Sequence, residues 1–206
     1  RGVTGGGVVA LAGEVGKPAA KDQGPTGLTI CSHASTQAPV TQFLNRHLQV
    51  PVPEMPEGVP PAVLQLFDPQ VSLFTYLVGC RRTGAAVLID PCIDQASRDL
   101  ALIEDLGYKL SHVLDTHIHS EHVTAAKFLK AAYSEAKSVA PMSPDLHADI
   151  LVADDDTVEV GDVRLRVLET PGHTEADVCY ALEVEGTATS VFTGDTLLVR
   201  GVGRTD

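Results

Sequence analysis

The chain has 206 residues, a formal net charge of −12 and a hydrophobic fraction of 44%. This length allows one main domain with a buried core and an appendage. The acidic balance argues against a nucleic-acid partner, because neutralising a phosphate backbone requires clustered Lys and Arg. It leaves room for a small anionic substrate, since a basic residue or a metal ion can reverse the local potential inside a pocket. No apolar run approaches the roughly 18 residues that span a bilayer, so we expect no membrane segment.

The first part of the chain differs in composition from the rest. Residues 1–13 are rich in glycine, and five prolines fall between Pro51 and Pro61. We expect residues 1–61 to be a flexible leader that ends in a semi-rigid linker, with one short helix over 40–50. The four cysteines form no Cys-x-x-Cys pair, which favours reduced thiols in an intracellular protein.

From Ala62 onward, short β-rich runs alternate with helical stretches. Strands are predicted over 71–79 and 85–90, followed by a helix within 94–109 for which Gly107 suits the C-terminal cap. A buried strand over 110–116 then leads into a predicted helix over 120–136 with Ser120 as N-cap. Further strands are expected within 156–172, 178–186 and 190–199. The alternation of strands and helices predicts a mixed α/β fold for residues 62–206.

Three histidines and a glutamate follow the apolar strand 110–116 in the string THIHSEH. In an extended loop, positions two apart project to the same side, so His117 and His119 can converge on one point. Glu121 and His122 would lie on the first turn of the following helix. Imidazole nitrogens suit zinc, iron, copper and nickel, and a carboxylate adds negative charge. A metal site is favoured over a polar helix entrance.

Two later strand ends add candidate ligands. His173 follows the tight turn Pro171-Gly172, and Asp195 follows a glycine at the end of another apolar strand. Each dipeptide alone is a common turn element. Together, three strand ends present His, His and Asp in a shared setting, and this combination makes the metal interpretation specific.

In this order, THIHSEH, TPGHT and TGDTLL resemble the metallo-β-lactamase superfamily. RGVGRTD, with FTYLVG and AVLIDP upstream, is similar to its persulfide dioxygenase branch, which is related to glyoxalase II. The resemblance implies an αββα sandwich, of which residues 62–206 would be the N-terminal part, with the chain truncated at its C-terminus. It also implies a single Fe(II) bound by His117, His173 and Asp195, with zinc as the alternative metal.

The same resemblance assigns roles to neighbouring residues. His119, Glu121 and His122 match positions that bind or adjoin a second metal in dinuclear relatives, and in the mononuclear branch they would orient ligands or hold water. Aspartate is usual at position 121. The extra methylene of Glu121 moves the carboxylate by roughly 1.5 Å, which disfavours a second metal.

Two further residues carry alternatives. Arg204 matches the branch motif and would bind a glutathione carboxylate, or it would pair with Asp206 or another acid. Asp90 lies at a strand end before a proline and would form the turn or support a ligand histidine, with the turn preferred.

The function implied by the resemblance is oxidation of glutathione persulfide by oxygen to sulfite and glutathione. The alternatives are a glyoxalase-II-like hydroxyacylglutathione thioesterase and an inactive, truncated metal-binding fragment. The expected partners are glutathione persulfide and oxygen, with a second copy of the chain as a possible dimer. By the same resemblance, a eukaryotic source would place the protein in mitochondria and a bacterial source in the cytoplasm.

Overall fold

The computed structural model describes residues 8–10 and 60–205, which form two β-sheets with helices beside one of them. The six-stranded sheet contains, in spatial order, β2 (Ala62–Asp68), β3 (Leu73–Gly79), β4 (Ala85–Ile89), β5 (Lys109–Leu114), β6 (Lys137–Pro141) and β7 (Ile150–Val152). The five-stranded sheet contains β1 (Val8–Ala10), β11 (Thr187–Phe192), β10 (Val178–Val184), β9 (Val163–Glu169) and β8 (Thr157–Val160).

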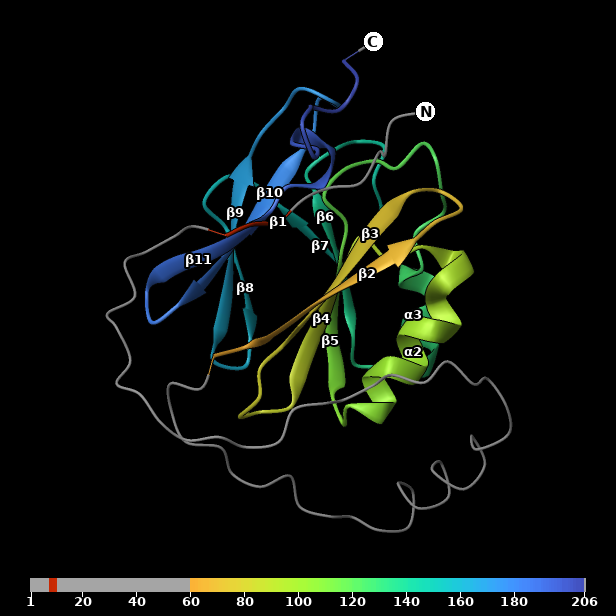
Figure 1. Cartoon of the computed structure of the whole chain (residues 1–206), viewed down its shortest axis with the longest axis vertical. Coiled ribbons are helices and arrows are strands. Elements are labelled where there is room, and N and C mark those ends of the chain that lie inside the picture. Colours follow the sequence, from red (N-terminus) through yellow and green to blue (C-terminus); the bar gives the residue numbers. More distant parts are fainter. Residues whose placement is uncertain (1–7, 11–59, 206) are drawn as a thin grey trace. The chain divides into compact units, whose positions relative to one another are not determined.

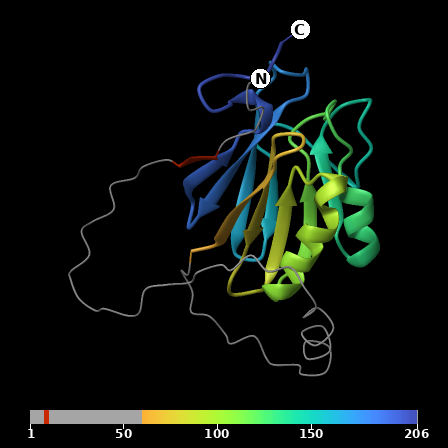
Figure 2. The same ribbon diagram turned by 45° about the vertical axis from the view of Figure 1, so that its right-hand side comes forward.

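The helices cover the outer face of the six-stranded sheet (Figures 1 and 2). They are α2 (Ala96–Asp105), preceded by the 3-10 turn η1 (Ile93–Gln95), and α3 (Ala126–Ala132). The inner face of this sheet packs against the five-stranded sheet, which in the described residues carries no helix longer than the 3-10 turn η2 (Gly194–Thr196). The expected sandwich of two sheets is therefore present, with one of its two helical layers.

The central strands β3 and β4 of the six-stranded sheet are buried on both faces, which explains their nearly continuous apolar sequences. On β3, Tyr76 and Val78 face the five-stranded sheet, where they join a core with Tyr180 and Phe192. Leu77 points to the opposite side, toward the helices. Burying a side chain of this size contributes about 1.5–3 kcal/mol, so these two cores hold the layers together.

Strands β4, β5, β6 and β7 run parallel, so their carboxyl ends meet at one edge of the sheet. The loops after β4 and β5 begin with Asp90 and Asp115 at that edge. This edge is the place where an open parallel sheet usually carries its functional groups.

The helix predicted over 94–109 is confirmed in a shorter form. At its C-terminus, the Gly107 N–H donates to the Glu104 carbonyl and the Tyr108 N–H donates to the Ile103 carbonyl. Gly107 has φ of 72°, the left-handed conformation that this capping motif requires.

Two other expectations about elements are wrong. The helix predicted over 120–136 spans only Ala126–Ala132, and Ser120 does not cap it. Residues 137–141 form β6, and β2 and β7 were also not foreseen as strands. Within the leader 1–61, residues 8–10 form β1 along β11, and the rest of the leader to residue 59, including the predicted short helix, lies outside the described residues. None of the helices within the described residues is long and apolar enough to cross a membrane.

Candidate metal centre

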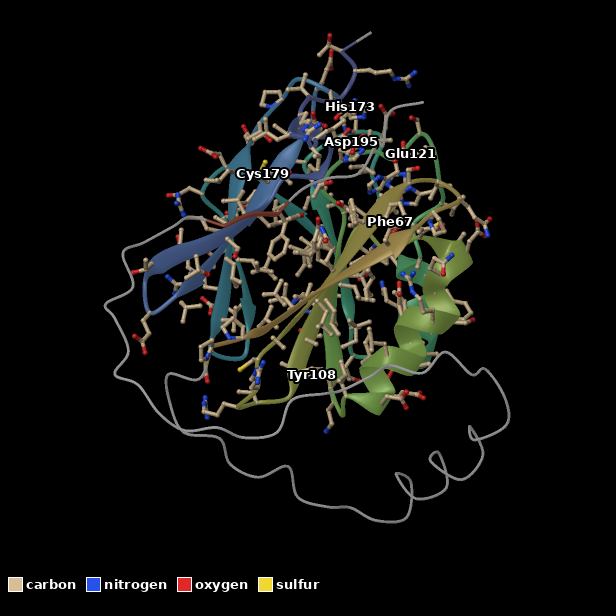
Figure 3. The ribbon with its side chains drawn as sticks, in the orientation of Figure 1. Phe67, Tyr108, Glu121, His173, Cys179 and Asp195 are labelled. Carbon is tan, nitrogen blue, oxygen red and sulfur yellow. The ribbon has the colours of Figure 1, made fainter. Side chains whose placement is uncertain are left out.

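Three loops at the same end of the molecule bring together His117, His173 and Asp195. His117 follows β5, His173 follows β9, and Asp195 lies in η2 after β11. Each offers one ligand atom, and these atoms all lie within 4.8 Å of one another. Figure 3 shows His173 and Asp195 side by side at this end, with Glu121 close by. The three residues predicted from the strand ends thus meet at one point.

The side chain of His117 is held in one tautomer by a relay. Its Nδ1 lies 2.9 Å from the Thr116 hydroxyl, and that hydroxyl lies 2.9 Å from Asp90 Oδ2. Because the carboxylate of Asp90 accepts the hydroxyl proton, the hydroxyl oxygen accepts from Nδ1–H of His117. Nε2 of His117 is buried without a hydrogen-bond partner. Burial, helped by the charge of His119, lowers the pKa of His117 to about 4. His117 therefore presents a neutral nitrogen with a free lone pair.

His173 is fixed in the same tautomer by the main chain. Its Nδ1 lies 2.7 Å from the carbonyl oxygen of Arg204, which can only accept, so Nδ1 carries the proton. The Asp177 carboxylate anchors the turn by accepting from the main-chain N–H groups of His173 and Thr174 at 2.8 Å. Nε2 of His173 lies 3.8 Å from Asp195 Oδ2. A second lone pair is thereby directed at the shared point.

Asp195 supplies the carboxylate. Burial raises its pKa, and the negative charge of Glu121 adds to that effect. The preceding Gly194 has φ of 48°, and a Cβ there would lie 2.8 Å from Cβ of Thr116. Glycine at 194 therefore allows the loop carrying Asp195 to lie against the loop carrying His117.

Two imidazoles and one carboxylate around a point form the donor set of many non-heme iron sites, and zinc accepts the same donors. The buried, unpartnered Nε2 of His117 is the observation that fits a bound cation best, because a polar atom buried without a partner costs about 1–3 kcal/mol. The residues present therefore fit a metal ion.

His119 lies beside this cluster, with both ring nitrogens facing carboxylates. Nε2 is 3.2 Å from Asp90 Oδ1, and Nδ1 is 3.2 Å from Glu121 Oε1. Burial opposes its protonation, but the hydrogen bond and charge of Asp90, together with Glu121, raise its pKa to about 10. The two carboxylates on either side of His119 thus favour its protonated form.

Glu121 and His122 complete the THIHSEH loop. They were expected on the first turn of a helix, but this segment is not helical. Partial burial opposes ionisation of Glu121, but its contacts with His119 and His122 hold its pKa well below the usual range. Both ring nitrogens of His122 are buried without a hydrogen bond, and Nδ1 lies 3.3 Å from Glu121 Oε1 outside hydrogen-bonding geometry. His122 is thus, after His117, the second histidine of this region with a buried ring nitrogen that has no hydrogen-bond partner.

The preferred interpretation of Asp90 as a turn residue was too narrow. Its φ of 52° does belong to a turn, but its buried carboxylate also accepts from the N–H of Thr116 at 2.7 Å and from the hydroxyl of Thr116. Sequence reasoning missed Thr116 and Asp177 altogether. The signal available in the sequence was closeness to a candidate ligand: Thr116 directly precedes His117, and Asp177 follows His173 by four residues.

Comparison with known proteins agrees with this geometry. The family profile described as the metallo-beta-lactamase superfamily matches residues 70–206. The chain belongs to the metallo-β-lactamase superfamily. It is 39% identical over 149 residues to the human protein named "Persulfide dioxygenase ETHE1, mitochondrial", an alignment that covers 72% of this chain and 58% of the human protein. The chain thus spans little more than half the length of the curated relatives that it matches.

The chain is also similar in sequence and in structure to other members of the superfamily. A hydroxyacylglutathione hydrolase of Rhodospirillum rubrum is 37% identical over 135 residues, covering 64% of this chain and 50% of that protein. The crystal structure of ETHE1 from Myxococcus xanthus superposes with a TM-score of 0.64 at 42% identity, covering 70% of this chain and 62% of that one. This chain is therefore an ETHE1-like metallo-β-lactamase protein that also lies near glyoxalase II.

The other sites expected for this superfamily member have mixed outcomes. Arg204 is exposed at the rim, and its main-chain carbonyl, rather than its guanidinium, holds a candidate ligand. Its possible partner Asp206 lies outside the described residues. Cys92 and Cys179 are buried and form no disulfide, which agrees with the expected reduced thiols, and burial raises the pKa of both.

Proposed function

We propose that the protein is an iron-dependent dioxygenase that oxidises glutathione persulfide. In the reaction, persulfide, O₂ and water give glutathione, sulfite and two protons. The S–S bond breaks, the outer sulfur is oxidised to sulfite, and O₂ is reduced as both its atoms enter the sulfite. The third sulfite oxygen comes from water.

The arrangement of His117, His173 and Asp195 is the observation that carries this proposal. Both histidines turn a free Nε2 toward the same point as the carboxylate, and each is locked by a hydrogen bond on Nδ1. Fe(II) bound by this set would keep open positions at which oxygen and the persulfide sulfur can meet.

The neighbours of the three ligands favour one metal over two. Both nitrogens of His119 lie 3.2 Å from carboxylate oxygens, of Asp90 and of Glu121. The ligand atoms of His117, His119 and Glu121 lie within 4.8 Å of one another, but a second ion bound there would require His119 to give up one of these two contacts. Asp90 holds both the loop of His117, through Thr116, and the ring of His119. The role of these residues is to orient the single-metal site and keep its ligands in place.

Arg204 is proposed to bind a carboxylate of the glutathione moiety. It is exposed, and its main chain contacts His173, so its side chain starts next to the metal centre. A guanidinium pairs with a carboxylate through two parallel hydrogen bonds, which would orient the substrate as well as attract it.

A glyoxalase-II-like thioesterase is the second candidate, and His122 favours it. Its two buried, unpartnered nitrogens suit a second metal near Glu121, and the relatives include hydroxyacylglutathione hydrolases. In that reaction a metal-activated water would attack the thioester carbonyl.

Oxygen uptake by the full chain loaded with Fe(II) tests the proposal. Adding glutathione persulfide should start uptake and release sulfite, and His117→Ala, folded to the same extent, should abolish both. Folded, iron-replete protein that consumes no oxygen but cleaves S-lactoylglutathione with zinc would replace the dioxygenase with the thioesterase. Absence of both activities from folded, metal-loaded protein would leave the third alternative, a chain that binds a metal ion without catalysing either reaction.

Metal stoichiometry separates the two enzymes independently of substrate. After dialysis against zinc, the wild-type chain should retain one ion. Glu121→Asp, which shortens the carboxylate and releases the Nδ1 of His119 that now lies 3.2 Å away, should raise the retained zinc toward two. Two ions in the wild-type chain would contradict the single-metal site.

A further inference from the structure

Residues 203–204 contact two candidate ligands that come from different loops. The Gly203 N–H donates to the main-chain carbonyl of Asp195 at 2.7 Å, and the Arg204 carbonyl accepts from Nδ1 of His173 at 2.7 Å. Asp195 is nine residues before Arg204 in the sequence, whereas His173 is 31 residues before it. Two consecutive residues therefore form hydrogen bonds to candidate ligands that lie on separate loops.

Gly203 occupies this position because of space, not because of its backbone angles. It is buried, and its φ lies outside the left-handed region. A Cβ on Gly203 would collide with the carbonyl oxygen of Asp195 and would lie 2.9 Å from Cβ and Cγ of His173. Contacts below 3.0 Å force a shift, and here the atoms that would have to move belong to the two ligands.

A second glycine in the same loop provides the contrast. Gly201 is exposed, its φ is also outside the left-handed region, and a Cβ there would meet nothing within 4 Å. Any side chain is compatible with position 201 on these grounds. Of these two positions, only 203 excludes a side chain through contacts with the candidate ligands themselves.

We propose that Gly203 is a positioning residue for the metal centre. Without a side chain, it lets the main chain lie against His173 and Asp195 at once. Its N–H then fixes the loop of Asp195, and the adjacent Arg204 carbonyl fixes the tautomer and direction of the His173 ring. The inference rests on the metal centre of the proposed function but not on the substrate or the reaction.

Co(II) binding to the full chain tests this role without relying on activity. Co(II) bound by imidazole and carboxylate absorbs visible light, so a titration reports both affinity and ligand geometry. Gly203→Ala should bind Co(II) about 10- to 100-fold more weakly than the wild-type chain, with an altered spectrum, as is usual when a group that orients a metal ligand is disturbed. Gly201→Ala should remain within about twofold of wild type. Equal affinities and spectra for the two variants, or equal losses, would overturn the proposal.

A second pair of variants decides the question if Gly203→Ala does not fold. Arg204→Gly and Arg204→Ala both remove the guanidinium, but only glycine loosens the main chain whose carbonyl holds His173. Arg204→Gly should bind Co(II) about two- to fivefold more weakly than Arg204→Ala, reflecting the extra backbone freedom of glycine. Indistinguishable affinities would show that the main chain at 204 does not position the ligand.

The outcomes also separate this inference from the proposed function. Wild-type protein that binds one Co(II) with the expected difference between Gly203→Ala and Gly201→Ala, yet consumes no oxygen with persulfide when loaded with iron, would sink the dioxygenase and retain the positioning role. Oxygen consumption with no difference between the glycine variants would retain the dioxygenase and reject the positioning role of Gly203.

Discussion

At the scale of single residues, the relay from His117 through Thr116 to Asp90 shows how neighbouring side chains orient a candidate metal ligand. The Thr116 hydroxyl accepts from His117 and donates to Asp90, so it determines which imidazole nitrogen is free. Gly194 makes room for Thr116, because a Cβ there would press on its side chain. The Thr116 side chain thus orients His117 through its hydroxyl and packs against the loop that carries Asp195.

Thr116→Val should remove this link while keeping the shape of the side chain. Loss of the hydroxyl leaves Nδ1 of His117 without an acceptor, so Zn(II) affinity should fall about 10- to 100-fold. The free energy of unfolding should fall by about 1–3 kcal/mol. Isothermal titration and urea unfolding measure the two effects.

Two matched variants control this experiment. Thr116→Ser keeps the hydroxyl and should restore most of the Zn(II) affinity. Thr124→Val removes the hydrogen bond of 2.8 Å to Asp115 but no hydrogen bond of His117, His173 or Asp195, so its Zn(II) affinity should stay near wild type. If Thr116→Val and Thr116→Ser bind zinc alike, the relay is not what orients His117.

A histidine away from the metal centre gives a prediction about acid stability. Burial, together with the charge of Lys137 on the neighbouring strand β6, lowers the pKa of His112 below its ordinary value of 6.5. Folded His112 stays neutral where the unfolded chain takes up a proton. Its contribution to stability is therefore complete above pH 6.5 and is lost as the pH falls below that value toward the folded pKa.

Replacement of His112 by glutamine should flatten this dependence. The wild-type midpoint of urea unfolding should drop between pH 7.5 and pH 5.5, and His112→Gln should reduce the size of that drop. His147→Gln, at an exposed histidine, should leave it unchanged. An equal drop in all three proteins would assign the acid sensitivity to other groups.

At the scale of elements, a comparison of two glycines with positive φ distinguishes the cost of backbone strain from the cost of steric overlap. Gly107 ends α2 at φ of 72°, and a Cβ there would meet nothing within 4 Å. Gly161 forms the turn between β8 and β9 at φ of 63°, but a Cβ there would collide with Thr83 and lie 2.8 Å from Sγ of Cys80. Alanine at position 107 would therefore introduce backbone strain alone, whereas alanine at position 161 would introduce backbone strain and a steric clash.

Gly107→Ala should lower the free energy of unfolding by about 1–2 kcal/mol, the cost of a left-handed alanine. Gly161→Ala should lower it by about 2–5 kcal/mol, because overpacking adds about 1–3 kcal/mol to the same strain. Urea unfolding compares them, with Gly172→Ala, whose Cβ would be unobstructed, as a reference. A Gly161→Ala cost no larger than that of Gly107→Ala would show that the turn between β8 and β9 yields to the added methyl group.

The sequence predicted those features of this site that depend on short-range patterns. Apolar strands followed by histidine or aspartate indicated the positions of His117, His173 and Asp195, and Gly107 indicated the end of α2. The helix predicted to start at Ser120 failed because tertiary contacts hold that segment instead. The Ile93 N–H donates to the Val123 carbonyl, and Thr124 bridges to Cys92, so the Ala-rich run becomes helical only at Ala126.

Features that depend on proximity between distant segments could not be predicted from the pattern. Asp90 reaches Thr116 across 26 residues, and Arg204 reaches His173 across 31. The Arg204 contact uses a main-chain carbonyl, which every residue type carries, so the sequence contains no local sign of it. The motif around Arg204 drew attention to its side chain, whereas the described contact uses its backbone.

At the scale of the whole molecule, the candidate metal centre joins the two sheets. His117 leaves the six-stranded sheet after β5, whereas His173 and Asp195 leave the five-stranded sheet after β9 and β11. The sheets otherwise meet through the apolar core around Tyr76, Tyr180 and Phe192. A metal ion at this end would add a connection between layers that the apolar core supplies elsewhere.

Metal loading should therefore stabilise the folded chain, and most strongly near the site. Zinc at 100 times its dissociation constant adds about 2.7 kcal/mol to the free energy of unfolding, because only the folded chain presents all three ligands together. Removing the metal with a chelator should increase hydrogen exchange in the loops after β5, β9 and β11. It should leave exchange unchanged at the opposite end near Tyr108, which Figure 3 shows far from the labelled site residues. His117→Ala should show neither response to chelator, and an equal destabilisation of that variant would place the stabilising metal away from the His117, His173 and Asp195 cluster.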